Sequence, residues 1–139
     1  MVHIRAARIA KIADDIGEVE VHGDDDAELL VLGWGSTWGP IATAVERLRV
    51  KGERVAYAHL VHLNPFPRNL GEVLRRFPRV VVPEMNLGQL CRLVRAEYLV
   101  DARPITKIAG QPFTAAELEV AIRAALASDR TDTSWEQPV

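Results

Sequence analysis

The chain lacks the residue patterns that mark several common kinds of site. Its 139 residues include one cysteine, Cys91, which excludes an internal disulfide; without a Cys-x-x-Cys pair the chain cannot hold an iron–sulfur cluster by itself. No apolar run reaches the roughly 18 residues that a membrane-spanning helix needs, and no secretory signal opens the sequence. We therefore expect a cytoplasmic protein with no membrane partner.

An excess of positive charge is also missing. The 17 basic and 19 acidic residues give a formal net charge of −2, and no block of lysines matches the acidic run at residues 24–26. Because nucleic-acid binding requires clustered Lys and Arg, we expect no nucleic-acid partner. What the chain does have is length and 48% hydrophobic content, enough for one domain to fold alone.

Strand and helix patterns alternate along the chain. Four times an apolar segment is followed by a loop and then by a capped amphipathic stretch, a pattern typical of an α/β fold with a parallel sheet. We expect a short edge strand at residues 18–21, then four strands at 29–33, 54–61, 79–82 and 105–109. In such sheets ligands bind beyond the carboxyl ends of the strands, so the loops at that edge are the candidate site.

Helix starts are predicted from proline and from capping pairs. Pro40 is expected at the first helical position, and three pairs resemble capping boxes: Asn69 with Glu72, Asn86 with Gln89 and Thr114 with Glu117. A first helix at residues 4–16 carries its bases early and its acids late, against the helix dipole. It therefore needs a partner surface, either on its own sheet or on a missing neighbouring domain.

A glycine-rich turn, Gly-Trp-Gly-Ser-Thr-Trp-Gly-Pro at residues 33–40, follows the first central strand. One interpretation is an anion site formed by the backbone N–H groups of Gly35, Ser36 and Thr37. The other is a tight turn whose tryptophans, Trp34 and Trp38, pack at a surface or interface. The spacing G-x-G-x-x-x-G departs from the dinucleotide fingerprint and from the P-loop, which favours the second interpretation.

The remaining reactive side chains do not assemble into a catalytic site. His59 and His62 lie near no other metal ligand, so structural roles are expected for both. Glu84 leaves the third central strand and is either a base or, as we favour, a hydrogen-bond acceptor for neighbouring backbone. Cys91 lies in the middle of an apolar helical stripe and is expected in the core. No Ser-His-Asp or Cys-His order is present, so we assign no catalytic residue.

Four loop motifs together resemble one family. The turn at 33–40 is followed by His-Leu-Asn-Pro-Phe-Pro-Arg-Asn-Leu (62–70), Pro-Glu-Met-Asn-Leu-Gly-Gln-Leu (83–90) and Ile-Ala-Gly-Gln-Pro-Phe (108–113). In this order they resemble the C-terminal region of the α subunit of 2-oxoglutarate:ferredoxin oxidoreductase, a 2-oxoacid:ferredoxin oxidoreductase, over about residues 1–127. The resemblance implies a transketolase C-terminal-like fold: three α/β/α layers and five strands in the order 1-3-2-4-5, with strand 1 antiparallel.

The resemblance also implies an activity for a complete enzyme. That enzyme oxidatively decarboxylates 2-oxoglutarate with coenzyme A to succinyl-CoA, CO2 and reduced ferredoxin. Its thiamine diphosphate, magnesium and iron–sulfur cluster are expected on preceding domains of the α subunit and on a thiamine-binding β subunit. We expect this fragment to bind none of them and to be inactive when isolated, because it lacks the electron sink that decarboxylation requires.

The expected division of the chain is a helix linking to a missing preceding domain at 1–16, the α/β domain at 17–128 and a flexible tail at 129–139. The domain is expected to support assembly, with candidate interface or anion-binding residues Gly35, Ser36, Thr37, Trp38, His62, Asn64, Phe66, Glu84 and Asn86. The alternative is a stand-alone, non-enzymatic module with an anion or coenzyme A site at the turn of residues 35–37.

Overall fold

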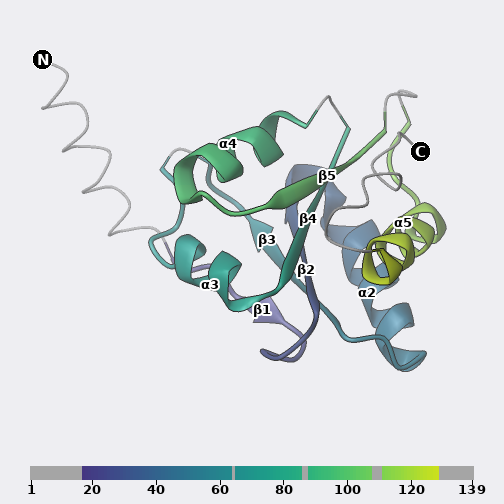
Figure 1. The fold of residues 1–139 in the computed structure, drawn as a ribbon. Coiled ribbons are helices and arrows are strands. Elements are labelled where there is room, and N and C mark those ends of the chain that lie inside the picture. The colour runs from purple at the N-terminus through teal and green to yellow at the C-terminus, as the bar shows by residue number, and fades with distance from the viewer. Residues whose placement is uncertain (1–16, 64, 86–87, 108–110, 129–139) are drawn as a thin grey trace, which may run out of the picture.

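A five-stranded sheet forms the centre of the molecule (Figure 1). The computed structural model describes residues 17–63, 65–85, 88–107 and 111–128. The strands are β1 (Val21–His22), β2 (Leu29–Trp34), β3 (Val55–Leu60), β4 (Arg79–Glu84) and β5 (Ala102–Thr106). Their order is β1-β3-β2-β4-β5, with β1 antiparallel and the others parallel, which confirms the predicted topology.

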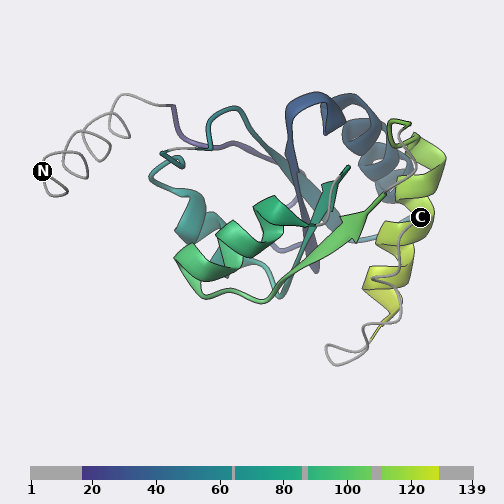
Figure 2. The same ribbon diagram turned by 90° about the horizontal axis from the view of Figure 1, so that it is seen from above.

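Helices cover both faces of the sheet. Helices α2 (Trp38–Val50) and α5 (Ala115–Ala127) lie on one face, and α3 (Leu70–Arg76) and α4 (Gln89–Tyr98) lie on the other (Figure 1 and Figure 2). A 3-10 turn, η1 (Gly35–Thr37), precedes α2. The three predicted layers are therefore confirmed. The helix expected at residues 4–16 and the tail expected at 129–139 lie outside the described residues.

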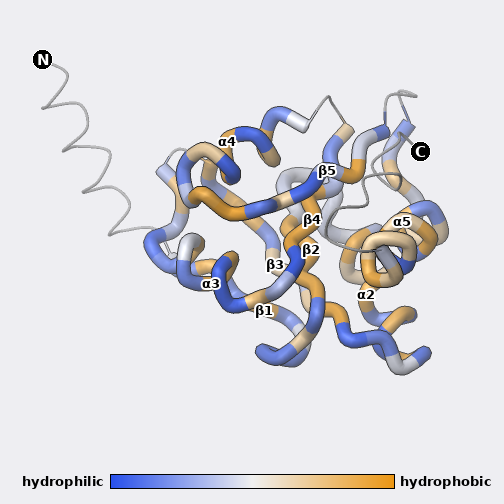
Figure 3. The backbone as a smooth tube through the Cα atoms, in the orientation of Figure 1, coloured by the Kyte–Doolittle hydropathy of each residue, from blue (hydrophilic) through white to orange (hydrophobic). Residues whose placement is uncertain are grey.

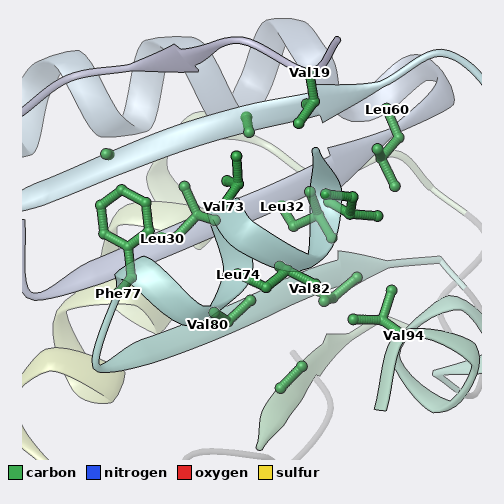
Figure 4. Packing of buried hydrophobic residues seen from close by; sticks show 14 of the residues in the cluster. Val19, Leu30, Leu32, Leu60, Val73, Leu74, Phe77, Val80, Val82 and Val94 are labelled. Carbon is green, nitrogen blue, oxygen red and sulfur yellow. The ribbon is translucent and has the colours of Figure 1, made fainter. Parts of the chain in front are cut away.

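The central strands are buried on both faces, as their continuous apolar runs predict. Because side chains alternate along a strand, Leu30 and Leu32 of β2 pack toward α3 and α4, whereas Leu29 and Val31 pack toward α2 and α5. Figure 4 shows the first cluster, and Figure 3 shows the apolar strands between the helical layers. Cys91 lies in the first cluster, where its Sγ donates to the Ala102 carbonyl at 3.2 Å; this confirms its predicted core position.

The edge strand β1 is shorter and later than predicted. We expected residues 18–21, but the strand is Val21–His22. The reason is a side chain: the Asn69 amide accepts from the Val19 N–H and donates to the Val19 carbonyl, both at 2.9 Å. These two bonds replace strand pairing at Val19, so the ladder with β3 begins only at Val21.

The other edge strand is also displaced. The expected strand at 105–109 is observed as Ala102–Thr106, which includes Pro104. Proline interrupts a central strand because it has no N–H to donate, but β5 is an edge strand and needs donors on one side only. The apolar content at 108–109 misled the sequence interpretation, and residues 108–110 lie outside the described residues.

Two of the three predicted capping boxes are wrong. Asn69 has helical backbone angles and its side chain is bound to Val19, so it does not cap α3. Helix α4 begins at Gln89 after Gly88, which has a φ of +83°, and not after Asn86. In the third pair the N-cap is confirmed, since the Thr114 hydroxyl accepts from the Glu117 N–H at 3.1 Å. Helix α2 begins at Trp38, two residues before Pro40, which a helix tolerates within its first turn.

The acidic run at residues 24–26 has partners that its neighbours in sequence do not suggest. Asp24, Asp25 and Asp26 lie within 3.9 Å, 3.1 Å and 2.8 Å of arginines from three different segments: Arg49, Arg76 and Arg54, respectively. Each pair is exposed and contributes little by itself. The run and its partners give the amino edge of the sheet a charged, solvated surface, opposite the edge where a ligand or partner is expected.

Candidate functional site

The topology places the candidate residues around one point of the sheet. The chain passes from β2 into α2 on one face of the sheet, and from β4 into α4 on the other face. The loops that follow β2 and β4 therefore leave toward opposite faces. In open α/β sheets this switch point, at the carboxyl ends of the strands, is where ligands and partners are bound.

The two strands at the switch point separate before they end. Pairing between β2 and β4 covers Leu29 to Val31 against Arg79 to Val81, although both strands continue for three more residues. Beyond that point β2 pairs only with β3, and β4 only with β5. Pro83 lies in this separated part of β4 and has no N–H to offer. The end of the ladder leaves both loops free to follow separate paths.

The turn after β2 is held by a hydroxyl group. Gly35 has a φ of +67°, and Thr37 is buried behind it. The Thr37 hydroxyl accepts from the Trp34 N–H at 3.1 Å and donates to the Trp34 carbonyl at 2.7 Å. Its donor proton and an acceptor lone pair are thus used within the turn. Gly35 and Ser36 are exposed. Of the three residues proposed for an anion site, Thr37 is the one whose side chain faces inward.

The tryptophans of this turn face solvent. Trp34 is 43% exposed and Trp38 is 49% exposed, as the sequence predicted for two surface tryptophans. Large aromatic side chains are uncommon at this exposure unless they contact another molecule or domain. The arrangement favours the interface interpretation of the turn.

The Glu84 carboxylate binds the backbone of the next helix, α4. Its side chain is buried, and its two carboxylate oxygens accept from the N–H groups of Leu90 at 2.6 Å and Cys91 at 3.1 Å. The first N–H groups of a helix have no partner within the helix, and a carboxylate also complements the positive end of the helix dipole. Glu84 therefore caps α4 from the end of β4, which is the structural alternative that the sequence favoured.

The two histidines near the end of β3 have different surroundings. Burial lowers the pKa of the His59 imidazole below its ordinary value, and a hydrogen bond to the Gly35 backbone partly opposes that shift. His62 is exposed at the start of the loop. Over residues 17–63, 65–85, 88–107 and 111–128, no group of three His, Cys, Asp or Glu side chains is arranged to hold a metal.

Phe66 faces inward from the loop after β3. Its ring lies 5.8 Å from the Tyr98 ring, centre to centre, and packs against the cluster beneath α3 and α4. A substitution at Phe66 would thus change the domain's own packing as well as any interface. Of the other predicted residues, Asn64 and Asn86 lie outside the described residues.

Sequence reasoning missed Lys107, which follows β5 at the same edge. It is buried, and its Nζ donates to the Pro112 carbonyl at 3.0 Å and to the Glu117 carboxylate at 2.8 Å. Its own N–H donates to the Glu84 carbonyl at 3.1 Å. A single lysine at the end of an apolar strand was the sequence feature that could have identified it. Through these hydrogen bonds Lys107 links the start of α5 to the end of β4.

Replacing Lys107 with methionine is expected to destabilise the protein at pH 7 and less so in acid. The Lys107 hydrogen bond holds the pKa of Glu117 below its ordinary value of about 4.3. The native state thus favours the ionised carboxylate, so the contribution is complete above that value and is lost as the pH falls through the lower folded pKa. Urea unfolding of both proteins between pH 3 and 7 measures the difference.

The matched control is Lys51→Met. Lys51 is paired with Glu119 at 3.0 Å and holds the pKa of that carboxyl low in the same way, but Lys51 is half-exposed. Water can replace more of the Lys51–Glu119 interaction because Lys51 is half-exposed, so the control substitution is expected to change the free energy of unfolding less at pH 7. Equal effects at the two positions, or a Lys107→Met effect that does not depend on pH, would contradict the assignment.

The described residues at this edge do not fit a magnesium–diphosphate group. Its binding needs oxygen ligands for the metal and free donors for the phosphates. The buried acid, Glu84, already accepts two helix N–H groups, and the Thr37 hydroxyl is engaged with Trp34. Separately, the part of the chain that the structure describes contains no helix with the length and hydropathy of a membrane span.

Comparison with known proteins identifies relatives. Residues 27–118 match the family model described as pyruvate:ferredoxin oxidoreductase core domain II. The chain is 54% identical over 130 residues to 2-oxoglutarate oxidoreductase subunit KorA of Mycobacterium tuberculosis, covering 91% of this chain and 19% of the relative. It is 44% identical over 105 residues to 2-oxoacid:ferredoxin oxidoreductase 1, subunit alpha, of Aeropyrum pernix, covering 72% and 16%, respectively.

Solved structures agree with the fold. A 2-oxoglutarate:ferredoxin oxidoreductase from Magnetococcus marinus, with 2-oxoglutarate, coenzyme A and succinyl-CoA bound, has a TM-score of 0.77 at 30% identity, covering 83% of this chain and 21% of that chain. A split gene transketolase, at 19% identity and a TM-score of 0.60, covers 78% and 41% and shares the fold alone. The chain thus spans about a fifth of the length of the two relatives named above.

Proposed function

Because this chain belongs to the family of pyruvate:ferredoxin oxidoreductase core domain II, we propose that it is part of the α subunit of a 2-oxoglutarate:ferredoxin oxidoreductase. The observation that carries the proposal is the 54% identity to the Mycobacterium tuberculosis subunit, which extends over nine-tenths of the chain. Residues 17–128 would form the domain, and the complete enzyme would act in the cytoplasm on 2-oxoglutarate and coenzyme A, with ferredoxin as electron acceptor.

The domain's own contribution is assembly. Thiamine diphosphate, magnesium and the iron–sulfur cluster would be supplied by other α-subunit domains and by a β subunit, since the described edge residues do not fit the diphosphate group. Thiamine diphosphate, where bound, supplies the electron sink for decarboxylation. This chain's residues instead fix the loops at the switch point: Thr37 closes the turn after β2, Glu84 caps α4 and Lys107 anchors α5.

The alternative of a stand-alone module with a coenzyme A site at Gly35–Thr37 is less well supported. The turn that would form the site is flanked by two exposed tryptophans, which favour an interface, and the Thr37 hydroxyl donates to the Trp34 carbonyl and offers no donor to a ligand. Calorimetric titration of the chain with coenzyme A tests it directly. We expect no heat of binding.

A hybrid enzyme tests the proposed function. The segment of the Mycobacterium tuberculosis subunit that matches this chain is replaced by the chain itself, and the hybrid is produced with its partner subunit. Because domains tolerate many substitutions when volume and patterning are kept, we expect 2-oxoglutarate-dependent and coenzyme A-dependent ferredoxin reduction within about ten-fold of the parent enzyme. The isolated chain is expected to show no such turnover.

The control hybrid carries the corresponding domain of the split gene transketolase, which shares the fold at 19% identity. It is expected to be inactive, because contacts to neighbouring domains depend on surface residues that the fold does not fix. An inactive hybrid with this chain, or turnover by the isolated chain, would contradict the proposal.

A further inference from the structure

We infer that four exposed apolar side chains at the carboxyl edge form a docking surface for another domain of the same polypeptide. The residues are Trp34, Trp38, Val61 and Met85, which are 43%, 49%, 76% and 36% exposed; we call them the apolar rim. Two of them, Val61 and Met85, are not among the candidates that the sequence identified. The inference rests on the proposed function, in that it takes the chain to be part of a longer α subunit.

The strand register brings the rim residues to one edge. Trp34 ends β2 and pairs with Leu60, the residue before Val61. Met85 directly follows the end of β4, which is the other neighbour of β2 in the sheet. Trp38 begins α2, one turn of η1 after Trp34. The rim therefore follows the ends of three adjacent parallel strands, across the switch point.

Two polar groups at this edge are turned away from the rim. The hydroxyl of Thr37 and the carboxylate of Glu84 are turned into the domain, where backbone groups satisfy them. The opposite edge differs: there three aspartates and three arginines face water. Aromatic residues and methionine are enriched at the centres of interfaces, and charged residues are depleted there. The carboxyl edge has the composition of a surface that another domain covers.

The size of the rim indicates which partner it fits. With about 150–250 Å² for a fully exposed aromatic side chain, the four residues expose on the order of 400 Å² together. A separate subunit needs about 800 Å² on each partner. Contacts between domains of one chain begin near 600 Å² in total, or about 300 Å² on each side. The rim alone supplies the area that a contact with a covalently linked domain needs, and about half of the area that a free subunit needs.

The lengths of the relatives indicate what covers the rim. The Magnetococcus marinus structure and the Mycobacterium tuberculosis subunit are single chains of which this chain covers 21% and 19%. A domain tethered in the same chain has a high effective concentration, so a contact of modest area suffices to hold it. We therefore assign the rim to an apolar surface of another α-subunit domain.

The hybrid α subunit, purified without its β partner, provides the test. In one variant Trp34→Thr is combined with Trp38→Ser; a second carries Val61→Asp alone, at a side chain too exposed for its loss to harm the core. The matched control combines Val50→Ser with Val120→Thr, which removes two exposed apolar side chains from α2 and α5. Scanning calorimetry is expected to show unfolding about 4 °C or more lower for both rim variants, and an unchanged control.

Each other outcome overturns the inference. Equal melting of rim variants and control would show that no domain covers the rim. The same variants are also produced together with the β subunit; rim variants that melt normally but fail to copurify with it would assign the rim to that subunit instead. Failure of the proposed function has a different signature, namely an unmodified hybrid that melts as one body alone but does not oxidise 2-oxoglutarate when it is produced with its β subunit.

Discussion

Replacing Glu84 with alanine is expected to lower the free energy of unfolding by about 3 kcal/mol, since two buried N–H groups lose a charged acceptor. These are the N–H groups of Leu90 and Cys91, bonded at 2.6 Å and 3.1 Å to a side chain that is 4% exposed. Water cannot easily replace the carboxylate at that depth. Urea unfolding followed by circular dichroism measures the change.

Two further variants separate capping from general packing. Glu84→Gln keeps the shape and one acceptor oxygen but loses the charge, so about half of the destabilisation is expected to remain. Glu97→Ala removes an exposed acid from the other end of α4 and is expected to change stability by less than about 0.5 kcal/mol. If Glu84→Ala and Glu97→Ala had the same effect, the capping role of Glu84 would be wrong.

Gly33→Ala is expected to destabilise the protein by about 2 kcal/mol through overpacking beneath the glycine-rich turn. An alanine Cβ would lie 2.6 Å from Ile41 Cδ1, 3.2 Å from His59 Nδ1 and 3.3 Å from Thr37 Oγ1. Ile41 is almost completely buried, so its terminal methyl group can move away only by displacing other core side chains. One of the three neighbours, Thr37, holds the glycine-rich turn.

A double-mutant cycle tests this cause. Ile41→Val removes the methyl group that Cβ would meet and costs about 1 kcal/mol alone. We expect the double variant Gly33→Ala/Ile41→Val to be more stable than the sum of the single effects predicts. Gly39→Ala is the control: its Cβ meets no atom within 4 Å, and alanine is expected to stabilise α2 by up to about 1 kcal/mol. Strict additivity at Gly33 and Ile41 would refute the steric explanation.

Elements with strong local signals were predicted well. The apolar runs that became β2, β3 and β4 are long and continuous, so their burial on both faces and the parallel order followed from the sequence. The edge elements were predicted less well. The true bounds of β1 depend on the side chain of Asn69, which is fifty residues from Val19 in sequence. No window of local sequence contains that information.

The candidate site, too, was predicted only in part from the sequence. The exposed tryptophans and the structural role favoured for Glu84 were predicted from their positions after apolar strands. The inward direction of Thr37 and Phe66, the anchoring by Lys107 and the rim at Val61 and Met85 were not. These depend on which strands lie side by side and on where the β2–β4 ladder ends, because a side chain's partners come from neighbouring elements.

The sequence by itself determined the class of fold, the strand order through the family resemblance and the edge of the sheet that matters, because hydrophobic periodicity and turn residues act over a few neighbouring positions. Only the tertiary structure decided which polar groups at that edge are free. Buried donors and acceptors must find partners wherever the fold places them. Pairing of Glu84 with α4 and of Thr37 with Trp34 satisfies those groups internally and leaves an apolar edge exposed.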